Sequence, residues 1–329
     1  MNFDDTPQEA AFRSQARAWI AANAPKEYED ELRATSLGRV GLKNADILEV
    51  AKAWQKKKAD AGWACLHWPK EYGGRGASPI ERVIWQQEEG PFGKLSGLFI
   101  IGHGMCGPTV MAYASEEHKR QYLPPLASGE KVWCQLFSEP AGGSDVAGLR
   151  TRAEKRGDAW VINGQKIWTS GAHYSDYGIL LTRTDPTVPK HKGLTMFFLD
   201  MKSKGVEVRP IKQASGLKYT SMRAISALSK GERPGPENSI GKLVAGPMIQ
   251  DVAAYALDLQ GAAGVLSGSE AELAGKFQAM LLRAPGTRVE GGTDEIMRNI
   301  IAERVLGLPG DIRVDKDVPF NQVPTKGRA

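Results

Sequence analysis

Residues 134–171, CQLFSEPAGGSDVAGLRTRAEKRGDAWVINGQKIWTSG, decide the fold because they hold two polar, glycine-bearing turns separated by a strand-turn-strand pattern. Apolar residues alternate at 160–162 and 166–168, on either side of Asn163-Gly164. Asn-Gly readily takes the positive φ values that a tight hairpin turn requires. The sequence therefore predicts a β-hairpin that brings the second polar turn beside the first.

The two polar turns carry groups that suit a flat, electron-accepting ring with a phosphate tail. The second turn offers the indole of Trp168 for stacking, and hydroxyl and backbone donors at Thr169 and Ser170. In the first turn, 138–145 reads SEPAGGSD, and small residues let backbone N–H groups approach an anion such as a pyrophosphate. Either turn alone is also typical of an ordinary surface loop. The prediction of a site depends on both turns at this spacing.

Apolar periodicity divides the chain into three regions of an α+β fold. Helical spacing predicts helices over 6–22, 46–61, 79–89, 98–113 and 115–127, the first capped by Thr6 before Pro7. Alternation then predicts strands near 131–138, 150–156, 159–169, 177–184, 194–201 and 206–212. Helical spacing returns after Leu217. We expect a helical domain over 1–130, a β-domain over 131–216 and a second helical domain over 217–329.

Composition argues against several classes of function. The 329 residues carry 43 basic and 38 acidic side chains, and this thin, dispersed excess does not favour nucleic-acid binding. Cys65, Cys106 and Cys134 are widely separated in apolar or aromatic surroundings, which predicts buried reduced thiols. The polar N-terminus has no apolar signal core, and no run is long enough to span a bilayer. We expect a cytoplasmic protein without a membrane partner.

A second glycine motif invites a different interpretation. Residues 102–107, GHGMCG, fit the G-x-G-x-x-G dinucleotide pattern after an apolar run. That fingerprint needs a strand, a turn and a helix within one βαβ unit, and Pro108 and the lack of a parallel-sheet pattern count against it. We expect a helix that packs closely through its glycines. His103 and Cys106 lack a second ligand pair, so no metal site is predicted.

Most of the chain resembles the flavin-dependent acyl-CoA dehydrogenase family. Beyond 134–171, the resemblance is carried by Gly62-Trp63, 68–76 (WPKEYGGRG), 115–119 (SEEHK), 123–126 (LPPL), 129–130, 291–296 (GGTDEI), 298–304 (RNIIAER) and 307–310 (GLPG). It implies a helical N-terminal domain, a central β-barrel-like domain and a C-terminal helical bundle. It also implies FAD as cofactor, an acyl-CoA thioester as substrate, a 2-enoyl-CoA product and an electron-transfer flavoprotein as electron acceptor.

The chain departs from the family pattern at 211–220, IKQASGLKYT. In the family, further strands close the barrel here and a long helix opens the bundle, whereas this sequence becomes helical almost at once. Either a segment is absent between positions 216 and 217, which are then not covalently adjacent, or the chain has a true deletion. We favour the first, since deletion of the last barrel strands would expose edges and unsatisfied backbone groups.

The resemblance also implies roles for particular residues. The backbone at Gln135, Phe137, Ser138, Gly143 and Ser144 would contact the flavin and its phosphates. Trp168, Thr169 and Ser170 would flank the isoalloxazine ring. Gln260, Gly261 and Gly264 would reach FAD of a neighbouring subunit, although Ala262 and Ala263 replace part of the family's pattern. Thr293 and Glu295 resemble residues near the adenosine, but an N-cap with an acidic first turn explains them equally well.

The family's usual position for the catalytic base holds no carboxylate in this sequence. Dehydrogenation across Cα and Cβ needs a carboxylate to remove the α-proton, a flavin N5 to accept the hydride, and hydrogen bonds to the thioester carbonyl. The family's C-terminal glutamate position falls on Gly291, and Glu290 lies one residue earlier. Glu290 is the candidate base, against a surface carboxylate or a subunit contact; family members without that glutamate use the long helix. We expect a homo-dimer or tetramer, with a non-catalytic subunit of a heteromeric dehydrogenase as the alternative.

Overall fold

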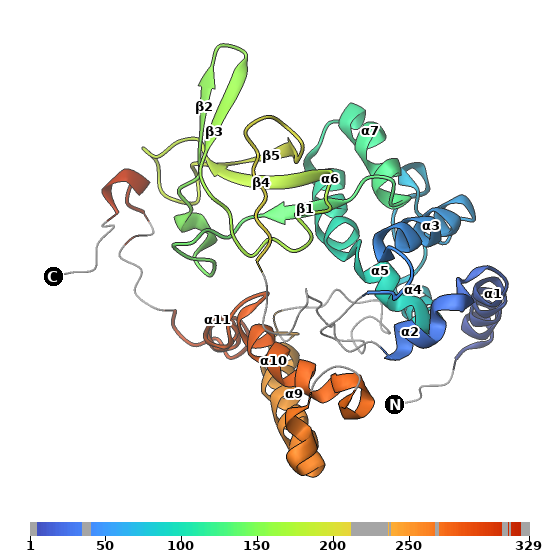
Figure 1. Ribbon diagram of the computed structural model, residues 1–329. Coiled ribbons are helices and arrows are strands. Elements are labelled where there is room, and N and C mark those ends of the chain that lie inside the picture. The colour runs from blue at the N-terminus through green and yellow to red at the C-terminus, as the bar shows by residue number, and fades with distance from the viewer. Residues whose placement is uncertain are drawn as a thin grey trace. The chain divides into compact units, whose positions relative to one another are not determined.

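The computed structural model describes residues 5–34, 41–211, 236, 238–266, 270–310, 315 and 317–323. The chain divides into two compact units, one comprising Met1–Lys131 and Lys212–Leu306, the other Val132–Ile211 and Gly307–Ala329. Helices occupy both ends of the sequence and strands the middle (Figure 1). The predicted break between positions 216 and 217 lies outside the described residues.

The N-terminal region folds into helices close to those predicted. They are α1 (Pro7–Asn23), α2 (Glu29–Ala34), α3 (Ile47–Asp60), α4 (Pro79–Glu88), α5 (Gly93–Gly97), α6 (Gly107–Tyr113) and α7 (Glu116–Ala127). Thr6 accepts a hydrogen bond from the N–H of Glu9, whose side chain accepts one from the N–H of Thr6, so α1 starts with a capping box. The predicted helix over 98–113 is instead interrupted by a π-helical turn at Gly102–Cys106.

A buried ion pair fixes these helices to one another. Lys58 of α3 donates to Glu89 Oε1 at 2.7 Å and to the hydroxyl of Ser96 at 2.6 Å. The indole N–H groups of Trp54 and Trp85 donate to the two oxygens of Glu89, each at 2.8 Å. Burial pushes the pKa of Glu89 up, but Lys58, Ser96 and Trp54 outweigh that effect and hold it below the usual range. The charge is fully compensated, as a buried carboxylate requires.

The glycine motif at 102–107 serves packing, as expected. A Cβ on Gly107 would lie 2.1 Å from Cζ2 of Trp68, whose side chain is completely buried. Helix α6 can therefore cross this indole only where the side chain is a hydrogen. Ring nitrogen Nε2 of His103 is 2.8 Å from the carbonyl oxygen of Leu126, and burial lowers the pKa of His103 to about 4. Among the described residues, no cluster of potential metal ligands occurs.

The middle of the chain forms a five-stranded sheet around β4. The strands are β1 (Trp133–Leu136), β2 (Arg152–Arg156), β3 (Ala159–Asn163), β4 (Tyr177–Arg183) and β5 (Leu194–Asp200). β4 pairs in parallel with β1 and antiparallel with β5, and meets β2 in parallel at its last residue, Arg183. β2 and β3 form an antiparallel hairpin (Figure 1). Cys134, Leu136, Leu180 and Met201 form a core on this sheet.

The hairpin turn is not the predicted one. Asn163 is the last residue of β3, and the turn lies at Gly157-Asp158, where Arg156 pairs with Ala159. Gly157 has φ +62° and so supplies the left-handed conformation that a tight turn needs. Residues 164–168 form no strand. The predicted strand at 206–212 is also wrong over 206–211, which carry no regular structure.

The C-terminal region contains α9 (Asn238–Gln260), α10 (Lys276–Val289) and α11 (Asp294–Ile300), followed by a π-helical turn at Ile301–Val305. Both α10 and α11 pack against α9. No disulfide joins the three cysteines; Cys106 and Cys134 are buried, as predicted, whereas Cys65 is half-buried. Across the described ranges no single helix is long and apolar enough to cross a membrane; the bent pair Gly90–Gly97 and Gly102–Tyr113 reaches that length and composition only together.

The contact between Gly107 and Trp68 gives a stability test. We expect Gly107→Ala to lower the free energy of unfolding by about 1–3 kcal/mol, because the added methyl must displace a buried indole. Gly104→Ala is the matched control: it lies in the same glycine motif, and a Cβ there would meet nothing within 4 Å. Helix propensity should leave that control unchanged or up to about 1 kcal/mol more stable. Urea unfolding of both variants measures the difference, and equal effects would contradict the packing role.

Candidate functional site

Two segments that are distant in sequence lie side by side at the end of β1. The N–H of Ile167 donates to the carbonyl of Ser138 at 2.9 Å. The ammonium of Lys166 donates to the carbonyl of Phe137, also at 2.9 Å. These bonds bring the polar turn at 138–145 beside the turn at 168–170, although no hairpin of the predicted kind joins them.

Glu139 anchors both segments. Its carboxylate accepts hydrogen bonds from the N–H of Arg150 at 2.7 Å, the N–H and hydroxyl of Thr151 at 2.8 and 2.6 Å, and Lys166 at 2.9 Å. Both charged side chains of the pair are buried. Burial raises the pKa of Glu139, but the bonds from Thr151, Arg150 and Lys166 outweigh it, so the pKa lies below its usual range. The carboxylate is fixed in its charged form and serves as a structural anchor.

The loop that follows Glu139 exposes its backbone. Residues 141–144 are all exposed, and the N–H groups of Gly143 and Ser144 make no hydrogen bond within the described part of the chain. A Cβ on Gly143 would lie 3.2 Å from Oγ of Ser138, so the loop runs close to that hydroxyl. Unpaired N–H groups on small residues can bind an anion such as a phosphate.

Trp168 has an unusual backbone for a large side chain. Its φ is +59°, and 68% of the residue is exposed. A bulky residue in the left-handed region is strained, and such strain concentrates at functional sites. Thr169 and Ser170 follow it half-buried, and Gly171 at φ +75° packs against the ring of Tyr174. An indole held in this way offers an open face to a flat ligand.

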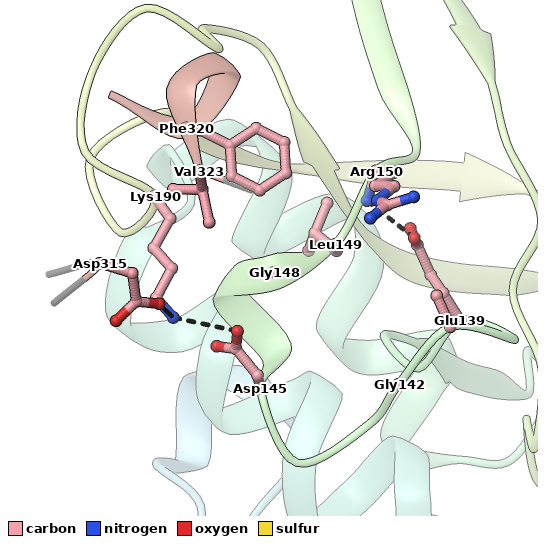
Figure 2. Close-up of a pocket in the computed structure, with 11 residues that line it drawn as sticks. Glu139, Gly142, Asp145, Gly148, Leu149, Arg150, Lys190, Asp315, Phe320 and Val323 are labelled. Atoms are coloured by element: carbon pink, nitrogen blue, oxygen red, sulfur yellow. Dashed lines mark hydrogen bonds and ion pairs between the residues drawn. The ribbon is translucent and has the colours of Figure 1, made fainter. Parts of the chain in front are cut away.

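A cavity of about 220 Å³ lies beside the glycine loop (Figure 2). It is lined by Glu139, Ala141, Gly142, Asp145, Gly148, Leu149, Arg150, Lys190, Asp315, Phe320 and Val323. Lys190 lies between two carboxylates, donating to Asp145 at 3.0 Å and to Asp315. The sequence motifs pointed to the loop but not to Lys190 or Phe320, because neither belongs to a local pattern and only the fold brings them here.

Gln260, Gly261 and Gly264 lie together at the end of α9. Gln278 of α10 donates to the side-chain oxygen of Gln260 at 3.1 Å and to the carbonyl of Gly264 at 3.2 Å. Gly261 has φ +55°, and a Cβ on Gly264 would lie 2.8 Å from the carbonyl oxygen of Leu257. The helix therefore ends in a tight turn that needs both glycines. These residues belong to the helical unit and are described within it alone.

The predicted site residues near the C-terminus, Thr293, Glu295 and Glu290, lie at the ends of α10 and α11. Thr293 caps α11 by accepting from the N–H of Ile296, and Glu295 is exposed in the first turn. Asp294 between them is buried and accepts from Arg288 at 2.7 Å. Glu290 follows α10, and its largely buried carboxylate accepts a hydrogen bond from Arg283. The buried role of Asp294 was not predicted, since any acidic residue suits the first turn of a helix.

Three family models match consecutive parts of the chain. They describe the N-terminal domain of acyl-CoA dehydrogenases at residues 6–130, the middle domain at 134–227 and the C-terminal domain at 212–306. The middle and C-terminal matches overlap at 212–227. Together they span both candidate loops and the C-terminal helices.

Individual relatives agree with these matches. The chain is 28% identical to acyl-CoA dehydrogenase IpdE1 of Mycobacterium tuberculosis, covering 92% of this chain and 98% of the relative. That alignment runs over 385 residues, more than the 329 of this chain, so the relative has segments without a counterpart here.

Solved structures show the same fold. The Tcur3481-Tcur3483 steroid ACAD superimposes with a TM-score of 0.75 at 24% identity, covering 94% of this chain and all of that one. The ChsE4-ChsE5 complex from Mycobacterium tuberculosis gives a TM-score of 0.73 at 24% identity, with the same coverage. The predicted fold, a helical N-terminal region, a central sheet and C-terminal helices, is confirmed. The chain belongs to the acyl-CoA dehydrogenase family, whose members are FAD-dependent oxidoreductases of lipid β-oxidation.

Proposed function

We propose that this chain binds FAD and dehydrogenates an acyl-CoA thioester between Cα and Cβ, releasing the 2-enoyl-CoA. One observation carries the proposal: an exposed indole in a strained backbone stands beside a loop with unpaired N–H groups, and both are fixed by the buried pair of Glu139 and Lys166. A flat ring with a phosphate tail fits this combination. When bound, the flavin would accept the β-hydride at N5, and an electron-transfer flavoprotein is the proposed electron acceptor.

Different residues of the sheet unit would bind different parts of FAD. Trp168 would stack on the ring system, and Thr169 and Ser170 would donate to its polar edge near N5. Gly143 and Ser144 would hold the phosphates through their N–H groups, while Gln135, Phe137 and Ser138 would contribute backbone contacts beside the ring. Because the loop is tied at Glu139, little ordering is required when the ligand binds.

Glu290 remains the candidate base, with one complication. Its contact with Arg283 stabilises the carboxylate, so it must leave that partner before it can take the α-proton of a substrate. This pairing favours a second hypothesis as well, in which the chain is a subunit of a heteromeric dehydrogenase that lacks its own base. Absorbance distinguishes the two, since a yellow protein that acyl-CoA bleaches without oxygen is catalytic by itself.

We also propose that a second subunit covers α9. Apolar side chains with 44% to 71% exposure repeat along this helix at spacings of three and four: Ile240, Val244, Met248, Val252, Tyr255 and Leu259. An exposed apolar stripe of this kind is typical of an interface, and IpdE1 has segments without a counterpart in this chain. Gln260 and Gly261 end the same helix, so this packing would bring them to a FAD held by the other subunit. The ChsE4-ChsE5 complex has the same fold.

Replacing Trp168 tests the flavin site. We expect Trp168→Ala to weaken FAD binding by about 1–3 kcal/mol, because the stacked area is lost. Trp160→Ala is the matched control, an exposed indole on β3 whose ring contacts Phe197. Fluorescence titration of the apoprotein with FAD gives both affinities. Unchanged FAD affinity in Trp168→Ala would show that FAD does not stack on this indole.

Replacing Glu290 tests the base. Glu290→Gln keeps the shape of the side chain but cannot take a proton, so anaerobic bleaching of bound flavin by acyl-CoA should slow by on the order of 10²- to 10⁴-fold while FAD stays bound. Glu272→Gln alters an exposed carboxylate in the same region and is the control. A near-normal rate in Glu290→Gln would assign the proton transfer to another carboxylate of this chain or of a partner subunit.

A charge on the apolar stripe tests the subunit contact. We expect Met248→Glu to shift the protein to a smaller species in sedimentation velocity and to lose FAD on dilution, since a buried unpaired charge opposes association. Asp251→Asn changes an exposed residue of the same helix and should leave both properties unaltered. If Met248→Glu dissociates the protein but leaves flavin content constant, the flavin is held within one subunit.

A further inference from the structure

The C-terminal tail binds to the sheet unit as a strap, defined here as Asp315 with residues 317–323. The N–H of Phe320 donates to the carbonyl of Val188, and that of Asn321 to the carbonyl of Pro186, both at 2.9 Å. Pro319 forms an isolated bridge with Pro189. The strap is therefore attached along one side of the loop between β4 and β5.

The ring of Phe320 covers a buried cation. Its centroid lies 3.8 Å from Cζ of Arg183, the last residue of β4, which is 2% exposed. Arg183 donates from Nη1 to the carbonyl of Lys190 at 2.6 Å and from Nη2 to the carbonyl of Ala147. Among the described residues, its Nε has no hydrogen-bond partner and no carboxylate forms an ion pair with it. The aromatic face is thus one of few groups that compensate this charge.

Arg183 connects the strap to the glycine loop. Ala147, which accepts from Nη2, belongs to the turn that closes the loop after Asp145. The backbone N–H of Arg183 donates to the carbonyl of Thr151 at 2.7 Å, and Thr151 in turn donates to Glu139. A second connection runs from Asp315 through Lys190 to Asp145. Figure 2 shows strap and loop on opposite walls of one cavity.

We propose that the strap is a positioning element for the flavin loop: Phe320 on Arg183 and Asp315 on Lys190 hold residues 141–148 in the conformation that receives the phosphates of FAD. Phe320 and Asp315 need touch no ligand in this role. The inference rests on the proposed function, because it assigns the loop to FAD. The affinity of this loop for FAD would then depend on residues more than 160 positions further along the chain.

The test is FAD affinity of the full-length apoprotein. Phe320→Ala removes the aromatic face from a desolvated guanidinium, and we expect the Kd for FAD to rise by about 3- to 30-fold. Phe320→Tyr retains the ring and should bind FAD within about twofold of wild type. Rescue by tyrosine separates the effect on Arg183 from a general loss of the tail.

Hydrogen exchange of the apoprotein provides a readout that does not involve the ligand. The loop amides of Gly142 and Gly148, which donate to the carbonyls of Glu139 and Asp145, should exchange faster in Phe320→Ala and in Asp315→Asn, while the β2–β3 hairpin keeps its wild-type rate. If Phe320→Ala does not fold, Asp315→Asn tests the strap proposal by itself. Wild-type exchange at Gly142 and Gly148 in the folded variants, or a Kd for FAD within twofold of wild type in both, overturns the strap proposal. Wild-type protein that binds no FAD refutes the proposed function instead.

Discussion

The carboxylate of Glu139 is the interaction on which the sheet unit depends. A buried carboxylate without partners is costly, and this one is satisfied by donors from two segments: the N–H groups of Arg150 and Thr151 with the hydroxyl of Thr151, and the ammonium of Lys166. Both donor segments are thereby held against Glu139. The entry to β2, the segment before Trp168 and the end of β1 therefore meet at one point, and the exposed loop 141–144 extends from a fixed base.

This anchor explains how an exposed and strained site can persist. A left-handed conformation at Trp168 costs on the order of 1–3 kcal/mol and survives only where neighbouring structure imposes it. Lys166 and Ile167, immediately before it, are tied to Phe137, Ser138 and Glu139. The local conformational cost is thus offset by buried hydrogen bonds two residues away. Gly171, also left-handed and packed on Tyr174, fixes the other side.

Local sequence signals predicted the elements well where one short motif was sufficient. Thr6 before Pro7 gave the start of α1, and Gly107 was expected to serve helix packing. The hairpin prediction failed because two turn-forming pairs lie six residues apart: Asn163-Gly164 is the stronger local signal, but the register of β2 and β3 places the turn at Gly157-Asp158. For the site, the two polar turns were evident in the sequence. Arg183, Lys190 and Phe320 were not, because their partners are distant in sequence. The guanidinium of Arg183 is compensated by two backbone carbonyls and the ring of Phe320, and no motif predicts those contacts.

The helical end of the chain shows the same dependence on distant partners at a larger scale. A helix with one apolar face is stabilised when that face is covered, yet α9 leaves apolar side chains from Ile240 to Leu259 exposed on one side while α10 and α11 pack on another. The alignment with IpdE1 spans 385 residues, more than the 329 of this chain, so parts of that relative have no counterpart here. The exposed stripe of α9 is explained if the covering residues come from a second subunit. Oligomerisation would then cover the apolar side of α9, the helix that ends in the tight turn at Gly261 and Gly264, which Gln278 already holds within the chain.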